Sequence, residues 1–269
     1  MDNSAAAWGL AVLWLYCTFM LFWALQWWLG RHIQGVALLV FNRPNLAANL
    51  YFYLLAPGVI LHELSHWLFA KLLFVPTKDL VLFRPQRSPD NNGKGGPITL
   101  GYVEIFKTDP LRQSLIGLAP LPVGLLVLLA LATLLNFNTG LSSSTLEPNT
   151  VWQSITAIPP EIVNSLKQPL NLLWLYFVFT VSNGMLPSRP DRKPWLVGFL
   201  LPGSILLALS LTGHLPPLSP EWQHGLRSFI ANLTWIFAFA ASLNFLLAIL
   251  IFLVEWMVSR MKKRRVVYK

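Results

Sequence analysis

Two histidines and a glutamate lie within five residues of an otherwise apolar stretch, in the sequence His62-Glu63-Leu64-Ser65-His66. An α-helix turns once in about 3.6 residues, so His62 and His66 are expected on one helix face, where both can reach one metal ion. Glu63 has the position of a general base beside the first ligand. Ionisable side chains are costly in a membrane-grade segment, so this pattern favours a functional site over two histidines hydrogen-bonded within a helix bundle.

A hydrolytic zinc site takes three protein ligands, and two histidines with a carboxylate are one of the common sets. Cys17 is the only cysteine, which excludes a disulfide within the chain and a cysteine-based zinc site. Asp191 follows a later apolar segment in a Pro-rich stretch, at a depth compatible with the histidines. Spacing alone leaves other candidates open, which are Asp79, Asp90, Glu104, Asp109, Glu161 and His214.

The elements that must position these residues are strongly apolar. Hydrophobic residues make up 55% of the 269 residues and charged residues 12%, whereas soluble domains carry about 25% charged residues. The composition excludes an ordinary soluble globule and predicts a polytopic membrane protein. The formal charge of +9 comes from basic residues at the C-terminal end and between apolar segments. That distribution indicates membrane topology and not nucleic-acid binding.

Six apolar segments are expected to cross a hydrocarbon core of about 30 Å. They are residues 5–29, 46–75, 115–135, 170–186, 195–211 and 230–258. The predicted fold class is an all-α polytopic membrane protein with about six transmembrane helices. Residues 1–269 are expected to form a single integral membrane domain, with a core at about 46–194 and flanking transmembrane helices at 5–29, 195–211 and 230–258. The first segment lacks the features of a cleavable signal, so it is expected to be retained.

Three interruptions of this pattern are also expected. Pro57-Gly58 is predicted to kink or break the helix just before His62. Residues 35–41 are too short to span and are expected to lie in the interface, and the polar residues 136–168 are expected to be a connector. Small residues and prolines at the start of segment 115–135, including Gly117 and Pro120, allow close backbone approach.

Residues 76–112 differ from the rest of the chain, being basic and rich in turn residues. Leu80-Val81-Leu82-Phe83 and residues 98–106 read as strands on either side of the turn-rich segment 88–97. A β-hairpin is therefore expected next to the metal-binding helix, with an amphipathic loop as the alternative.

The basic residues also predict the orientation. Residues 260–265 carry five Lys and Arg side chains, which mark their side of the membrane as cytoplasmic. Counting back through six spans places both termini, the 76–112 hairpin and the candidate site toward the cytoplasmic side. Arg31 and Arg43 then fall on the opposite side, against the positive-inside bias.

Three features of the sequence together resemble the site-2 protease family of intramembrane zinc metalloproteases. They are His62-Glu63-Leu64-Ser65-His66 in a membrane helix, a later span that ends near Asn183 with Asp191 eight residues on, and a Gly/Pro-rich span between these two. The resemblance runs from about Pro57 to Arg192. It implies one zinc ion held by His62, His66 and Asp191, with Glu63 as the general base and Asn183 as a substrate contact. The chain differs from the family where Pro190-Asp191-Arg192 replaces Leu-Asp-Gly and where Gly117-Leu118-Ala119-Pro120 stands for Gly-Pro-x-x-Asn.

The resemblance also implies a membrane-associated β-hairpin with strands near residues 79–85 and 98–106. The strand edge at Gly101, Tyr102 and Val103 is expected to hold a substrate as an added strand, which exposes its backbone to attack. No connector is long enough for an attached PDZ or CBS domain, so a minimal form is expected.

The function expected from these features is that of a zinc endopeptidase that cuts peptide bonds within or near transmembrane segments of other proteins. Its expected location is a prokaryotic cytoplasmic membrane, and its expected partners are the protein substrate and the lipid bilayer, with no nucleic acid. Alternatives are a non-catalytic zinc-binding regulator or chaperone, a metal transporter, and a CAAX-type membrane metalloprotease. Glu63 argues against the first, because a structural site needs no base. A transporter would spread acidic or His ligands over several spans, and a CAAX-type enzyme usually has Glu as third ligand.

Overall fold

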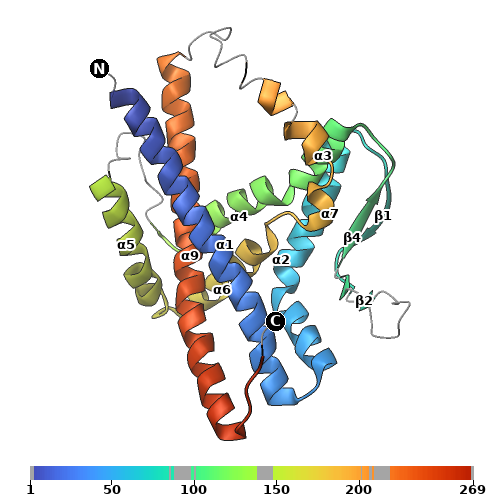
Figure 1. Ribbon diagram of the computed structural model, residues 1–269, viewed down its shortest axis with the longest axis vertical. Helices are drawn as coiled ribbons and strands as arrows, with labels where there is room; N and C mark the ends of the chain where they lie inside the picture. Colours follow the sequence, from blue (N-terminus) through green and yellow to red (C-terminus); the bar gives the residue numbers. More distant parts are fainter. Residues whose placement is uncertain are drawn as a thin grey trace. The chain divides into compact units, whose positions relative to one another are not determined.

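The structure is a computed structural model that describes residues 3–84, 86–87, 98–99, 101–137, 148–200, 202–205, 208 and 219–267. It is mostly helical, with short strands between the second and third helices (Figure 1). The elements in chain order are α1 (Asn3–Phe41), α2 (Pro44–Leu72), β1 (Thr77–Val81), β2 (Gln86–Arg87), β3 (Ile98–Thr99), β4 (Tyr102–Ile105), α3 (Pro110–Leu118), α4 (Pro120–Leu134), α5 (Pro148–Ser165), α6 (Pro169–Gly184), α7 (Arg189–Arg192), the π-helix η2 (Leu196–Leu200) and α9 (Pro220–Lys262). The helical fold class and the small sheet are thus confirmed.

The chain divides into two compact units. The first unit comprises residues 1–54, 128–179 and 219–269, and the second comprises residues 55–127 and 180–218. His62, Glu63, His66 and Asp191 all belong to the second unit.

Among the described residues, three helical segments are long and apolar enough to cross a membrane. They are Trp8–Phe41, Pro110–Leu134 and Pro220–Lys262. These segments support a membrane protein and coincide with three of the six expected spans. The expected spans at 46–75 and 170–186 are helical, as α2 and α6, but are not in this set. The span expected at 195–211 lies partly outside the described residues.

Three local expectations differ from the structure. Residues 35–41 are not a separate segment but continue α1 without a break, because the polar side chains just before them find partners: Arg31 lies over the Trp27 ring and His32 pairs with Glu255. A kink or a break was expected at Pro57, and the break is absent because α2 continues through this residue. The region 136–168, expected to be a connector, contains α5, because its buried face, formed by Val151, Ile158 and Ile162, favours a helix despite two internal prolines.

Helices α1 and α9 of the first unit pack against each other in parallel. Their contacts run down both helices in the same order, from Trp8 with Arg227, through Phe19 and Phe22 with Phe237, to His32 with Glu255 and Leu39 with Lys262. Figure 1 shows both helices descending together. Two parallel helices that each cross a membrane once have their C-terminal ends on one face. The sequence predicted six crossings, and in a chain with an even number of crossings the first and last helices run in opposite directions. The parallel packing of α1 and α9 differs from that prediction.

The predicted β-hairpin is present in the second unit. Strands β1 and β4 pair antiparallel, with Leu80 opposite Val103 and Val81 opposite Tyr102, and the register shifts between Thr77 and Asp79. A second pair, β2 with β3, extends the hairpin toward residues 88–97, which lie outside the described residues.

Candidate metal centre

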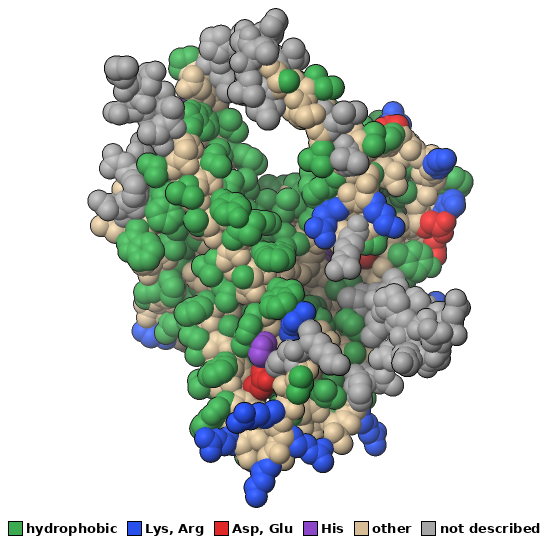
Figure 2. Space-filling model, viewed as in Figure 1, with side chains coloured by type: hydrophobic (Ala, Val, Ile, Leu, Met, Phe, Trp, Pro, Cys, Tyr) green, Lys and Arg blue, Asp and Glu red, His purple; other side chains and the backbone are tan. Residues whose placement is uncertain are grey.

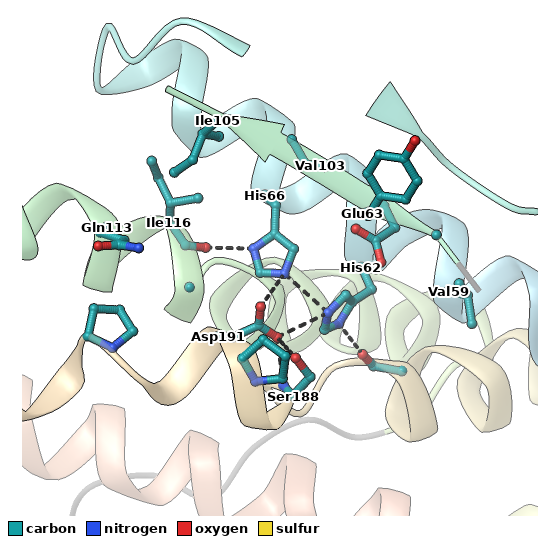
Figure 3. Close-up of a pocket in the computed structure, with 16 residues that line it drawn as sticks. Val59, His62, Glu63, His66, Val103, Ile105, Gln113, Ile116, Ser188 and Asp191 are labelled. Carbon is teal, nitrogen blue, oxygen red and sulfur yellow. Dashed lines mark hydrogen bonds and ion pairs between the residues drawn. The ribbon is translucent and has the colours of Figure 1, made fainter. Parts of the chain in front are cut away.

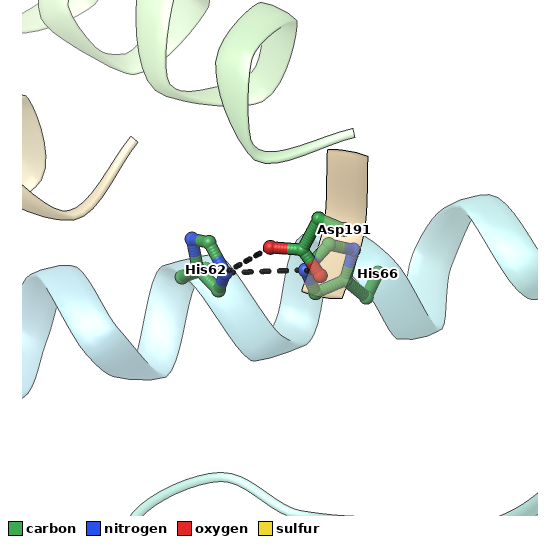
Figure 4. A group of neighbouring side chains, drawn as sticks. All are labelled: His62, His66 and Asp191. Carbon is green, nitrogen blue, oxygen red and sulfur yellow. Dashed lines mark hydrogen bonds and ion pairs between the residues drawn. The ribbon is translucent and has the colours of Figure 1, made fainter. Parts of the chain in front are cut away.

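His62, His66 and Asp191 converge from two elements of the second unit, α2 and α7 (Figure 4). The Nε2 atoms of the two histidines are 3.1 Å apart. The Asp191 carboxylate approaches His62 Nε2 at 3.5 Å and His66 Nε2 at 3.4 Å. Zinc binds nitrogen and oxygen ligands at about 2.0–2.1 Å, which gives a tetrahedron with edges of about 3.3 Å. The two Nε2 atoms and the Asp191 carboxylate, whose Oδ2 faces His62 and whose Oδ1 faces His66, therefore lie close enough together to hold one metal ion.

The opposite side of each imidazole ring is held by a backbone carbonyl. His62 Nδ1 lies 2.7 Å from the Gly184 oxygen, and His66 Nδ1 lies 2.7 Å from the Ile116 oxygen. A carbonyl only accepts hydrogen bonds, so each Nδ1 carries the proton and donates it. In the neutral rings the Nε2 lone pairs then face each other and the carboxylate. Three electron-rich groups at this distance require a cation or additional protons between them, which is the arrangement of a metal-ligand set.

Asp191 is held by the residue that precedes its short helix. Its Oδ2 accepts hydrogen bonds from the backbone N–H of Ser188 at 2.6 Å and from the Ser188 hydroxyl at 2.5 Å. Burial would raise the pKa of Asp191, but the neighbouring His62 and His66 rings and the Ser188 hydroxyl lower it well below its ordinary value. The carboxylate is thus oriented and ionised at neutral pH. The Ser-x-x-Asp spacing is the sequence signal that indicates this contact, as in a capping box.

Close backbone contacts at glycines bring these elements together. A Cβ atom at Gly58 would collide with the backbone of Thr180, and one at Gly184 would lie 2.7 Å from the backbone of Gly58. Gly58 is four residues before His62, on the same face of α2. This contact brings α6 close enough for the Gly184 carbonyl to reach His62. At Gly117 of α3, a Cβ atom would collide with the backbone of Asp191, so the expected close approach in this segment is confirmed at Gly117.

Glu63 lies beside the metal ligands, and 9% of its surface is exposed. It lines the same pocket as His62, His66 and Asp191 (Figure 3). The expected substrate residues Gly101, Tyr102 and Val103 form one wall of this pocket. The other lining residues are mostly apolar and come from α2, α3 and the segment around α7: Val59, Ile116, Gly117, Pro190 and Pro194 among them. The pocket therefore combines three candidate metal ligands and a carboxylate with walls suited to an apolar chain.

The hairpin contacts Glu63 directly. A Cβ atom at Gly101 would lie 2.7 Å from Glu63 Cγ and 2.7 Å from the Val81 oxygen, so a larger residue at position 101 would push against the candidate base. The Tyr102 hydroxyl donates to Asp79 Oδ2 at 2.8 Å, and this bond raises the pKa of Tyr102. Asn183, the expected substrate contact, is half-buried on α6 beside Gly184. Gly184 lines the pocket, and Asn183 is not among the pocket's described lining residues.

The other acidic residues considered for the third ligand have different roles where the structure describes them. Asp79 accepts from Tyr102, Glu104 pairs with Lys78 at 2.9 Å, and Asp109 accepts from the backbone N–H of Arg112 at the start of α3. Glu161 is exposed on α5 in the first unit. Asp90 and His214 lie outside the described residues. The structure thus brings Asp191 to the two histidines.

Sequence reasoning missed the two carbonyls that orient the histidines, because neither Gly184 nor Ile116 has a side chain that suggests a polar role. It also missed Gln113, which lines the pocket from the first turn of α3. Comparisons of this chain with protein-family models, curated proteins and solved structures gave no match.

Proposed function

We propose that this protein is an intramembrane zinc endopeptidase. The observation that carries the proposal is the group of His62, His66 and Asp191, in which backbone carbonyls hold both Nδ1 atoms and turn both Nε2 atoms toward one carboxylate. Two imidazole nitrogens and one carboxylate at these distances suit zinc and leave a fourth position for the reacting groups. A zinc ion held there would polarise a peptide carbonyl and lower the pKa of water.

Glu63 is the proton carrier in this proposal. It takes a proton from the water molecule that attacks the peptide carbonyl, and a carbon–oxygen bond forms. It then gives the proton to the amide nitrogen as the carbon–nitrogen bond breaks, so that a carboxylic acid and an amine leave. Its place among the pocket-lining residues, beside both histidines, supports this role. A purely structural metal site would not require a buried carboxylate at this position.

The hairpin provides a place for the substrate backbone. Within the described part of the chain, β4 pairs with β1 along one edge, and Gly101, Tyr102, Val103 and Ile105 line the pocket. An extended peptide beside β4 can form backbone hydrogen bonds there and pass the metal ligands. Such pairing requires a helical segment to unwind first, which fits the cleavage of transmembrane segments.

The two faces of α2 support a site within the membrane. Gly58, His62, His66 and Ala70 recur every four residues on the face that carries the site. Ile60, Leu64, Leu68 and Leu72 recur with the same spacing on another face and are all exposed. A helix with buried histidines on one side and exposed apolar residues on the other suits contact with lipid. We therefore place α2, like the three more apolar segments, in the bilayer.

The test compares purified wild-type protein with Glu63→Gln and with Glu104→Gln, the same substitution on the exposed hairpin. Zinc content and cleavage of a transmembrane peptide are both measured. We expect Glu63→Gln to keep zinc and to lose cleavage by roughly 10²–10⁴-fold, and Glu104→Gln to resemble the wild type. Cleavage by Glu63→Gln at the wild-type rate would refute the mechanism, and zinc binding by an inactive wild type would favour the non-catalytic regulator.

A further inference from the structure

Charged residues in the two parallel helices of the first unit are confined to their ends. Helix α1 has no charged residue from Asn3 to Gly30, and α9 has none from Ser228 to Val254. Each stretch extends about 40 Å at 1.5 Å per residue, more than the 30 Å or so of a hydrocarbon core. Because the helices are parallel, their C-terminal charges meet at one end. They are Arg31, His32, Arg43, Glu255, Arg260, Lys262, Lys263, Arg264 and Arg265.

This basic end is a packed structure. Lys262 Nζ donates to the carbonyl oxygens of Leu39 and Val40, at 2.7 Å each, and thereby caps the end of α1. Arg264 donates to the Asn42 side chain at 3.2 Å. The remaining basic residues Arg43, Lys263 and Arg265 are exposed around this cap. The single acidic residue at this end, Glu255, is paired with His32.

Exposed tryptophans lie one turn before the basic residues on both helices. Arg31 lies 3.9 Å from the centre of the Trp27 ring, and Arg260 lies 5.4 Å from that of Trp256. Both rings are more than half exposed. Tryptophan concentrates at the level of the lipid headgroups, so the basic residues beyond Trp256, the ring nearer the ends of the two helices, lie at the level of the phosphates.

We propose that the joined C-terminal ends of α1 and α9 bind anionic phospholipid headgroups. Guanidinium and ammonium groups bind phosphate through charge-assisted hydrogen bonds. Exposed apolar side chains of α9 just before Trp256, including Leu250, Phe252 and Leu253, provide a surface for acyl chains. Figure 2 shows Lys and Arg side chains at the lower end, below a broad hydrophobic surface. An apolar surface next to the charges favours a lipid over a nucleic acid, which would need a solvent-exposed basic groove.

The test uses full-length protein released from mixed phosphatidylglycerol and phosphatidylcholine, with the retained lipid measured by native mass spectrometry. The site variant is Arg43→Gln with Lys263→Asn and Arg265→Gln; Asn is chosen because residue 263 has a φ of 52°. The matched control removes three exposed basic residues elsewhere, as Lys107→Gln, Arg112→Gln and Lys167→Gln. Each basic residue near an anionic surface contributes roughly a factor of five, so we expect a preference for phosphatidylglycerol reduced roughly 100-fold in the site variant alone.

A charge-retaining variant, Arg43→Lys with Lys263→Arg and Arg265→Lys, should keep the preference and so separates lost charge from lost folding. High salt should weaken retention by the wild type. An unchanged preference in the site variant, or an equal loss in the control, would overturn the proposal. Displacement of phosphatidylglycerol by inorganic phosphate would assign the site to free phosphate and would also overturn it.

Discussion

The contact between Gly117 and Asp191 permits a test of the metal centre that leaves every proposed ligand in place. Substitution Gly117→Ala adds one methyl group to α3. That carbon would lie 3.4 Å from Asp191 Cα and well inside 3.0 Å of the Asp191 carbonyl oxygen, closer than Cβ atoms approach other atoms. Both sides of the contact are backbone, so no side chain can rotate away. The two segments must separate by about 1 Å, at a typical overpacking cost of about 1–3 kcal/mol.

The effect on the metal follows from the ligand triangle. A separation of about 1 Å would lengthen the distances from the Asp191 carboxylate to the histidines, now 3.4 and 3.5 Å, to about 4.4 Å. That exceeds the tetrahedral edge of about 3.3 Å. The carboxylate would then leave the coordination distance of an ion held by His62 and His66. Perturbing a residue that only orients a ligand costs about 10–100-fold in affinity, so we expect a loss of about 100-fold or more.

The assay is a competition titration of zinc between the purified protein and a chromophoric chelator, with thermal unfolding followed in parallel. Gly203→Ala is the matched control, because it lies in a helix of the same unit and its Cβ would have nothing within 4 Å. This control should bind zinc as the wild type does. If Gly117→Ala also bound zinc with wild-type affinity, the inferred position of Asp191 at the metal would be refuted.

Three further predictions test neighbouring features. Gly101→Ala should push the hairpin against Glu63 and reduce peptide cleavage about 100-fold, while metal analysis should find the zinc content unchanged. Loss of zinc would contradict the inference that Gly101 affects the candidate base and not the metal ligands. Ser188→Ala removes one of two donors to the aspartate ligand and should weaken zinc affinity about 10-fold in the chelator assay, whereas an unchanged affinity would show that the backbone donor suffices. In a variant without the native cysteine, Arg43→Cys and Arg265→Cys should react with a membrane-impermeant maleimide from the same face of sealed vesicles; labelling from opposite faces would contradict a parallel crossing of α1 and α9.

The histidine ligands were predictable because metal binding by a helix requires these side chains at a fixed spacing. His62 and His66 had to share a helix face. Asp191 was one of several carboxylates that the spacing left open, and the family resemblance singled it out. The hairpin was predictable from its turn-rich centre and apolar flanks, and the paired strands β1 and β4 confirm it. Helix α5 was not predictable in this way, because its segment is polar overall. Its few apolar residues form a buried stripe that stabilises the helix only through packing against α9.

The orientation of the helices could not be obtained by counting spans. The count placed Arg31 and Arg43 on the opposite side from the basic residues 260–265, against the positive-inside bias. Parallel packing of α1 and α9 places all of them at one end. If one segment is wrongly counted as a span, or one span is missed, the predicted side of the membrane is reversed for every segment counted after it. Contacts between two helices far apart in the sequence instead show directly whether those helices are parallel or antiparallel.

The helix that carries the metal motif uses a third residue that the motif does not include. Gly58, His62 and His66 are spaced four apart, so the glycine occupies the same face one turn before the first ligand. Because Gly58 has no side chain, α6 contacts α2 closely enough for the Gly184 carbonyl to accept the His62 proton. That hydrogen bond decides which imidazole nitrogen faces Asp191. The orientation of the His62 ring therefore depends on Gly58, one turn before the motif, because a side chain at that position would keep α6 away from α2.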